Sequence, residues 1–342
     1  MSGLSSLVLW PMQKFLVIQT AFIGDVVLAT ALIEKLRQFY PAAQIDFLLR
    51  KGNENLLSKH PYINEVLVWN KKENKYKNLY RILQKIRSKK YDTVINVQRF
   101  AATGFLTVFS GAKNTVGFDK NPWSSFFSTR VIHEISTGEK PLHEINRNQK
   151  LIEHITDSIP EKPKLYPSIS DYESVKKYKE NTYVCIAPAS VWFTKQYPKE
   201  KWVSLINKLP KNLQVYLLGA PTDDDLCNNI INESIDKKAI NLAGKFSFLQ
   251  SAALQQNAVM NYVNDSAPMH FASSMNAPVA AIYCSTVPWF GFGPLSDNSF
   301  VIQTKEQLSC KPCGLHGFKA CPLGHFKCAY SIQDQKLLEV LT

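Results

Sequence analysis

Long apolar runs are missing from this sequence of 342 residues. No uninterrupted run approaches the roughly 20 apolar residues that a transmembrane helix needs. Residues 1–11 contain no basic segment and no small-residue cleavage site, so we expect no secretory signal. They precede Met12 and the first strong strand, and we expect them to be a loose tail or an upstream extension outside the fold.

Glycine and proline are modest in number, at 14 and 18 residues, and 45% of the chain is apolar. This composition excludes disordered, collagen-like and coiled-coil proteins. The length corresponds to two domains at the usual ~150 residues each. Each half is long enough to bury a hydrophobic core of its own.

Acidic residues are few relative to basic residues, and the imbalance lies almost entirely in the first half. The chain has 40 Lys and Arg against 28 Asp and Glu, a net charge of +12. Residues 1–170 hold 24 basic and 14 acidic residues (+10), and the remainder holds 16 and 14 (+2). Such asymmetry predicts an anionic partner for the first half, namely nucleic acid, an anionic membrane or a phosphorylated substrate. A solvated basic surface is the simpler alternative.

Cysteine is rare outside the C-terminal region. Three residues stand singly in apolar surroundings, as buried thiols do: Cys185, Cys227 and Cys284. Four more gather near the C-terminus: Cys310, Cys313, Cys321 and Cys328. The first pair has zinc-ligand spacing and the second does not, so a structural metal site, a disulfide and reduced thiols all stay open. With no signal sequence, we expect a reducing cytoplasm.

Short apolar runs alternate with amphipathic stretches along both halves, which predicts a parallel α/β sheet in each. In the first half we expect strands at 14–20, 44–49, 65–69 and 91–97, and helices at 26–39 and 78–87. In the second half we expect strands at 183–187, 214–218, 258–262 and 278–283, and helices at 199–208, 223–231, 247–255, 268–275 and 333–341. Residues 157–181, polar and with three prolines, are predicted to be a linker. The expected domains are therefore 12–165 and 180–330, followed by a C-terminal helix within 331–342.

Four segments follow predicted strands, where an open α/β protein binds its ligands. They are Ile23–Thr30, Ala187–Pro198, Leu218–Asp225 and Asn264–His270. Small residues and Lys195 in the second segment suit an anion. Ser266 and Pro268 in the fourth begin a helix whose free amides can receive a phosphate.

Each segment also has a simpler interpretation. Asp25 can be a helix cap, and Lys195 can be a solvated lysine. The acids that begin with Asp223 can complement a helix dipole, which we favour over a metal site. His270 can be a packed core histidine.

Taken together, the segments resemble glycosyltransferase family 9, the bacterial lipopolysaccharide heptosyltransferases. The resemblance runs from Lys14 to Ile332 and is most specific in the stretch NDSAPMHFAS at residues 264–273. It also includes GDVVLAT at 24–30, LLGAPTDDD at 217–225, LAGK at 242–245, and the group Lys195, Tyr197, Pro198 and Trp202. Three positions depart from the family pattern: Ala31, where the family often has proline; Gln196, where it often has a basic residue; and Ala267, where it has glycine.

The resemblance implies a GT-B architecture, with two Rossmann-like domains that face each other across a cleft. It implies inverting transfer of a heptose from ADP-heptose to a lipopolysaccharide inner-core acceptor in a Gram-negative bacterium, without a required metal or other cofactor. The implied catalytic residues are Asp25, as general base, and Lys195. The implied donor-binding residues are Ser190, Asp223, Lys245, Asp265, Ser266, Ala267, Pro268 and His270.

The basic first domain is expected to bind the acceptor, an anionic lipid-linked oligosaccharide. The expected acceptor residues are Gly24, Lys85, Lys89, Lys90 and Arg99. The most basic segment, Asn70–Asp92, has nine Lys or Arg against two acids, and its polar face could also contact the inner face of the inner membrane. Another family 9 transferase with a different donor and a catalytically silent acceptor-binding relative stay open as alternatives. No nucleic-acid-binding motif supports a role based on charge alone.

Overall fold

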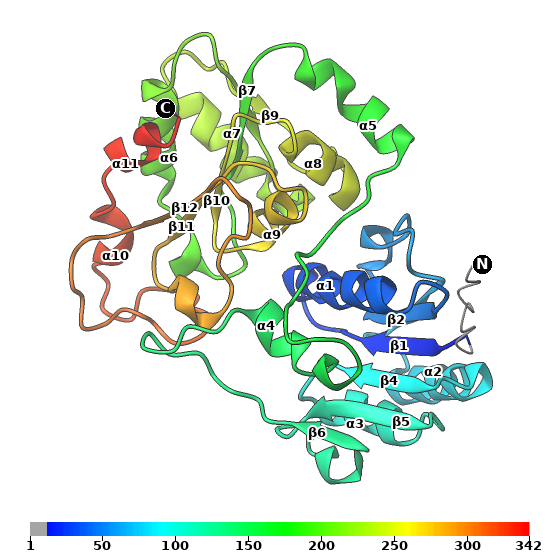
Figure 1. Ribbon diagram of the computed structural model, residues 1–342. Helices are drawn as coiled ribbons and strands as arrows, with labels where there is room; N and C mark the ends of the chain where they lie inside the picture. Colours follow the sequence, from blue (N-terminus) through cyan, green and yellow to red (C-terminus); the bar gives the residue numbers. More distant parts are fainter. Residues whose placement is uncertain (1–11, 342) are drawn as a thin grey trace, which may run out of the picture.

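The structure is a computed structural model that describes residues 12–341. The segment 1–11, expected to be a tail or an extension, lies outside the described residues, as does Thr342. The described chain forms two parallel sheets of six strands each (Figure 1). The strand order is β3-β2-β1-β4-β5-β6 in the first sheet and β12-β11-β10-β7-β8-β9 in the second. Every helix among residues 12–341 is too short or too polar to span a bilayer.

The first sheet is built from the N-terminal half of the chain. Its strands are β1 (Lys14–Ile18), β2 (Gln44–Arg50), β3 (Glu65–Trp69), β4 (Thr93–Asn96), β5 (Asn114–Phe118) and β6 (Thr129–Val131). Its helices are α1 (Ile23–Phe39), α2 (Lys75–Lys89), α3 (Ala101–Val108) and α4 (Glu144–Gln149). Short 3₁₀ turns occupy Glu54–Leu56, Ser124–Phe126 and Glu153–Ile155.

The second sheet follows the same plan. Its strands are β7 (Tyr183–Ala187), β8 (Gln214–Leu217), β9 (Ile240–Asn241), β10 (Met260–Asn264), β11 (Val279–Tyr283) and β12 (Ser299–Gln303). Its helices are α5 (Ile169–Val175), α6 (Lys199–Lys208), α7 (Asp224–Glu233), α8 (Phe248–Gln255), α9 (Ala267–Ser274), α10 (Lys327–Tyr330) and α11 (Gln335–Glu339). The 3₁₀ turns are Lys176–Lys179, Phe193–Lys195, Pro221–Asp223 and Pro288–Phe290.

The expected strands and helices are present, with ends that differ by a few residues. The segment predicted to be a linker is different, because residues 169–175 within it form α5. A capping box between Ser168 and Asp171 starts this helix, and Val175 packs into the core of the second sheet. The region between β4 and residue 157, for which no elements were predicted, contains α3, β5, β6 and α4.

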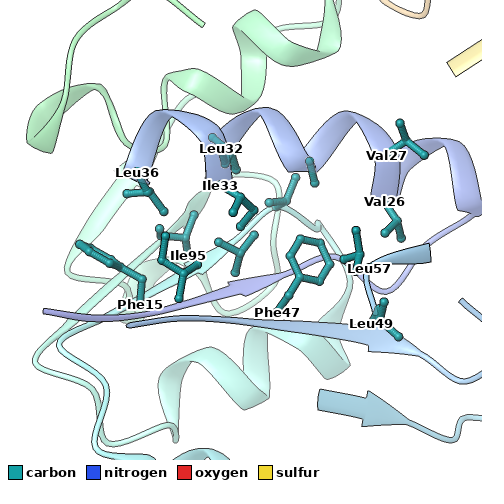
Figure 2. Close-up of a cluster of buried hydrophobic side chains, with 14 of the residues drawn as sticks. Phe15, Val26, Val27, Leu32, Ile33, Leu36, Phe47, Leu49, Leu57 and Ile95 are labelled. Carbon is teal, nitrogen blue, oxygen red and sulfur yellow. The ribbon is translucent and has the colours of Figure 1, made fainter. Parts of the chain in front are cut away.

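One hydrophobic core of the first half lies between its sheet and α1 (Figure 2), and another, which includes Leu16 and Ile86, lies on the other face with α2 and α3. Side chains of α1 such as Leu32 and Leu36 point toward Phe15 and Phe47 on the strands beneath (Figure 2). The same hydrophobic cluster continues to Phe271 of α9 in the second half. Helix α1 therefore packs on both its own sheet and its neighbour's helices, and it brings the carboxyl ends of the two sheets together.

Candidate active site

A pocket of about 660 Å³ lies at the carboxyl ends of β7, β8 and β10. Five of the expected donor residues line it: Ser190, Asp223, Ser266, Ala267 and Pro268. Ile23 at the start of α1 contributes the wall from the first half. Two other hollows, of about 590 and 200 Å³, contain none of the expected site residues. The sequence motifs thus converge on one pocket between the two sheets.

Lys195 and Asp265 form a largely buried ion pair beside this pocket. Lys195 Nζ lies 2.7 Å from Asp265 Oδ2, and the Thr286 hydroxyl donates to the same oxygen at 2.6 Å. Asp265 directly precedes Ser266, which lines the pocket. Lys195 is therefore held by a specific partner, which argues against the interpretation as a freely solvated lysine.

The loop that carries Lys195 is fixed by buried side chains. Asn264, at the end of β10, accepts a hydrogen bond from the Tyr197 amide at 2.9 Å and donates to the Pro188 carbonyl at 2.8 Å. The Thr194 hydroxyl accepts from the Phe318 amide at 2.7 Å. These bonds hold Lys195 in place because both ends of its loop are anchored to rigid parts of the second half.

Helix α9 starts at the pocket with its first amides uncapped by a side chain. Ser266 occupies the N-cap, yet its hydroxyl donates back to the Asn264 carbonyl at 3.3 Å and makes no capping bond. Pro268 stands in the first turn, where it removes no helical hydrogen bond. The start of α9 therefore presents free backbone amide groups and the positive end of the helix dipole to the pocket. This arrangement is suited to binding a phosphate group.

Asp25 lies in the first turn of α1, at the carboxyl end of β1. Its Oδ2 accepts a hydrogen bond from the Phe22 amide at 3.2 Å, so Asp25 does take part in capping, at the third helical position. Burial raises the pKa of Asp25, while the Phe22 amide, His316 and Arg50 lower it; the net shift is upward. Ile23, two residues earlier, lines the pocket, and a carboxylate with a raised pKa is suited to accept a proton.

Gly24 and His270 touch across the junction of the two halves. A Cβ on Gly24 would lie 2.7 Å from Cδ2 of His270, so only glycine allows α1 and α9 to approach this closely. Burial lowers the pKa of His270 to about 3, helped by His143 and Lys195. His270 is thus a packed, neutral histidine in contact with Gly24, and the expected acceptor contact of Gly24 and donor contact of His270 stay predictions.

The remaining expected donor residues differ in position. Asp223 lines the pocket, and its Oδ2 accepts from the Ala220 amide at 2.7 Å to close its own turn. Lys245 is exposed, and its neighbours Gly244 and Phe246, rather than Lys245 itself, line the pocket. Within residues 12–341, no group of three or more Asp, Glu, His or Cys is placed to hold a metal, so the acidic residues after Asp223 do not form a metal site there.

The three lysines expected to bind the acceptor lie at the end of the first sheet opposite to Asp25. Lys85 Nζ is 2.5 Å from Glu65 Oε1, and Lys89 also pairs with Glu65, which begins β3. Lys90 ends α2. In a parallel sheet the helix that leads into a strand ends at the amino edge, opposite the edge where Asp25 lies. Arg99, which follows β4, lies at the same edge as Asp25, as does Gly24.

Two basic residues that were not among the expected site residues also lie at the edge where Asp25 lies. Arg50 ends β2, and it lowers the pKa of Asp25. Lys71 follows β3 and donates to the Thr20 hydroxyl at 2.7 Å, while burial, with Arg50 and Lys75, lowers its pKa to about 8. Their position after predicted strands could have identified them as candidate site residues. The higher density of lysines in α2 instead favoured that helix.

The cysteine-rich segment forms part of the site wall. A Cβ on Gly317 would lie within 3.1 Å of Lys195, and His316 next to it lowers the pKa of Asp25. The cysteine side chains of the described residues are free thiols, and Cys313, Cys321 and Cys328 interact electrostatically with one another. Neither a disulfide nor a metal cluster therefore forms from Cys310, Cys313, Cys321 and Cys328 in the described part of the chain.

Comparison with known proteins gives a consistent result. A family model for glycosyltransferase family 9 (heptosyltransferase) matches residues 79–317. Lipopolysaccharide heptosyltransferase 3 of Escherichia coli is 27% identical over 290 residues, which cover 81% of this chain and 85% of that protein. Among solved structures, a family 9 glycosyl transferase from Veillonella parvula superimposes with a TM-score of 0.84 at 21% identity, over 96% of this chain and 97% of that one.

A second solved structure, E. coli heptosyltransferase WaaC with ADP, has a TM-score of 0.73 at 16% identity and covers 96% of this chain and 100% of that chain. These likenesses confirm the expected GT-B architecture of two Rossmann-like units. With the family model spanning more than half of the sequence, the chain belongs to glycosyltransferase family 9, the heptosyltransferase family, and is a glycosyltransferase.

Proposed function

We propose that this protein transfers a heptose from ADP-heptose to the inner core of a lipopolysaccharide, with inversion at the anomeric carbon. The observation that carries the proposal is the approach of the start of α1, which holds Asp25, to α9 and to the segment of His316 and Gly317 that lies beside Lys195. Curated heptosyltransferases with detectable sequence similarity and a structural neighbour that holds ADP support the choice of donor.

The donor would bind in the 660 Å³ pocket, with its diphosphate at the start of α9. Asp223 and Ser190 line the part of the pocket assigned to the nucleoside, where Asp223 would accept hydrogen bonds from ribose hydroxyls. Lys195 would face the phosphate next to the sugar, and Asp265 would orient Lys195 or contact the sugar itself. We assign the nucleotide site to the second domain, residues 180–330.

In the transfer step, the Asp25 carboxylate takes the proton of the acceptor hydroxyl as its oxygen forms a bond to the anomeric carbon. The bond between that carbon and the β-phosphate oxygen breaks, and the electron pair leaves with ADP. Negative charge grows on the departing phosphate, where Lys195 and the α9 amide lower its energy. The proton thus ends on the Asp25 carboxylate, and the electron pair leaves with ADP.

The acceptor would bind along the first domain, residues 12–165, at the carboxyl edge of its sheet. Arg50, Lys71 and Arg99 would supply positive charge along the edge that holds Asp25, for the phosphates and acidic sugars of an inner core. We propose that the protein works in the cytoplasm, in peripheral contact with the inner face of the inner membrane, because its acceptor is anchored there by lipid.

The experiment is a donor screen with purified protein. The protein is incubated with ADP-heptose, ADP-glucose or a UDP-sugar and with truncated lipid A core acceptors. The masses of the products are measured by mass spectrometry. The proposal predicts a mass gain of one heptose with ADP-heptose alone. Transfer from a UDP-sugar, or faster transfer from ADP-glucose than from ADP-heptose, would show that the proposed donor is wrong. The assignment to the glycosyltransferase family would still hold.

A further inference from the structure

The outer face of α3 carries no charged side chain. Its exposed and half-exposed residues are Ala101, Ala102, Phe105 and Val108, followed by Phe109 at the helix end. A surface helix of an α/β protein normally shows polar residues to solvent. The apolar face of α3 differs from this normal pattern, and such a surface is typical of a binding site for another molecule.

Two further aromatic residues extend this face. Trp123 lies 6.0 Å from Phe105 and 5.7 Å from Phe109 between ring centroids, and Phe126 lies 6.0 Å from Trp123. Phe109 is 40% exposed and Phe126 is 67% exposed. We call Phe105, Phe109, Trp123 and Phe126 the aromatic patch. Four rings in mutual contact near solvent form a larger apolar surface than isolated exposed side chains do.

The surroundings of the aromatic patch are strongly basic. Residues 75–130 contain eleven Lys or Arg and two Asp. Helix α2 lies beside α3, because Arg87 of α2 donates to the Phe109 carbonyl at 3.2 Å. The same flank of α2 shows Tyr76 and Tyr80, which are 79% and 59% exposed. Aromatic residues with a basic fringe are the combination that binds anionic membrane surfaces.

We propose that the aromatic patch and the adjacent flank of α2 dock on an anionic lipid bilayer. Charge complementarity selects this occupant, since two copies joined through the patch would bring two basic fringes together. Helix α3 starts directly after β4, next to Arg99, so the docked face begins at the edge where Asp25 lies and extends toward the opposite edge, where Arg87 meets Phe109. This orientation, which rests on the proposed function, would present a membrane-anchored acceptor to the cleft.

Vesicle sedimentation tests the proposal without donor or acceptor, so its result does not depend on transferase activity. Vesicles of phosphatidylethanolamine with phosphatidylglycerol are compared with vesicles of phosphatidylcholine alone. Wild-type protein should sediment with the anionic vesicles and less so at high salt. Phe109→Ser with Phe126→Ser should weaken this binding by about tenfold or more, because two partly exposed rings lose their burial.

The matched control is Ile169→Ser with Ile235→Ser, which removes two exposed apolar side chains from the second half. It should bind vesicles as the wild type does, and unchanged ADP affinity in both variants shows that they fold. The proposal would be overturned if the wild-type protein did not sediment with anionic vesicles. It would also be overturned if the Phe109/Phe126 variant bound them as strongly as the wild type. So would a lipid-free dimer that the same two substitutions dissociate, because a second copy would then be the occupant.

Discussion

The ammonium of Lys195 lies 2.7 Å from the carboxylate of Asp265, in a largely buried pair that adjoins the start of α9. We predict that Lys195→Met weakens ADP binding and lowers kcat/KM by about 10- to 1,000-fold, the range for loss of a group that stabilises growing charge. Calorimetry with ADP and steady-state kinetics measure the two effects. Lys208→Met, which removes an exposed lysine paired with Asp334, is the control and should change neither.

Unchanged kinetics in Lys195→Met would show that the ion pair with Asp265 is structural only. Asp265→Asn provides a second measurement on the same pair. It frees Lys195 from its carboxylate partner, so ADP affinity should stay or rise while transfer slows. A loss of ADP affinity in Asp265→Asn would instead place the carboxylate in direct contact with the donor.

Gly24→Ala is predicted to strain the junction of the two halves. The new Cβ would stand 2.7 Å from the His270 ring, and such overpacking typically costs about 1–3 kcal/mol of unfolding free energy. His270→Ala should restore part of this loss in the double variant, as coupled neighbours do. Gly138→Ala is the control, because its Cβ would meet its nearest neighbour, Trp289, at an ordinary 3.8 Å. Equal unfolding midpoints for Gly24→Ala and Gly138→Ala would refute the close approach.

The pH dependence of turnover should report the pKa of Asp25. Transfer needs its carboxylate form, so kcat falls as pH falls through this pKa, which burial raises above 3.8. Arg50 lowers the same pKa, and Arg50→Met therefore should move the acid limb to higher pH by up to about one unit. Saturating acceptor keeps binding effects out of kcat. Arg81→Met, on the exposed side of α2, should leave the limb in place, and a downward shift for Arg50→Met would contradict the assignment.

Acceptor affinity should depend on the carboxyl edge of the first sheet rather than on the end of α2. Lys71→Met and Arg99→Met should each raise the acceptor KM by about tenfold, as loss of a charge-assisted hydrogen bond does. ADP affinity should stay constant in both. Lys85→Met with Lys89→Met is the matched pair and should leave KM unchanged for a micellar acceptor. A raised acceptor KM in Lys85→Met with Lys89→Met, and an unchanged KM in Lys71→Met and Arg99→Met, would show that the lysines of α2 bind the acceptor.

The strands that carry the site were predictable because they are short, buried and rich in β-branched residues, and the motifs after them gave Asp25, Lys195 and Ser266. Helix α3 was missed since its outer face is apolar, so its sequence lacks the alternation that marks a surface helix. Helix α5 was hidden in a proline-containing segment, although its Ser168–Asp171 capping box was visible.

The sequence could not reveal contacts that depend on how the two halves meet. Gly24 and His270 are 246 positions apart, and only the packing of α1 on α9 brings them together. Lysine density pointed to Lys85 and Lys89, because charge counts carry no information on which edge of a sheet a helix end reaches. Sheet topology places those lysines beside Glu65, whereas Arg50 lies near Asp25 and Lys71 lies near Arg50.

If Asp25 removes the acceptor proton, Asp25→Asn should abolish that step without disturbing the fold. The asparagine keeps the size of the side chain and can still accept the Phe22 amide hydrogen bond, so the melting temperature and ADP affinity should match the wild type. Single-turnover transfer with bound donor and saturating acceptor should slow by about 10²–10⁴-fold, the usual contribution of a general base. A near-wild-type single-turnover rate in Asp25→Asn would contradict the account and leave Asp25 with a capping role alone.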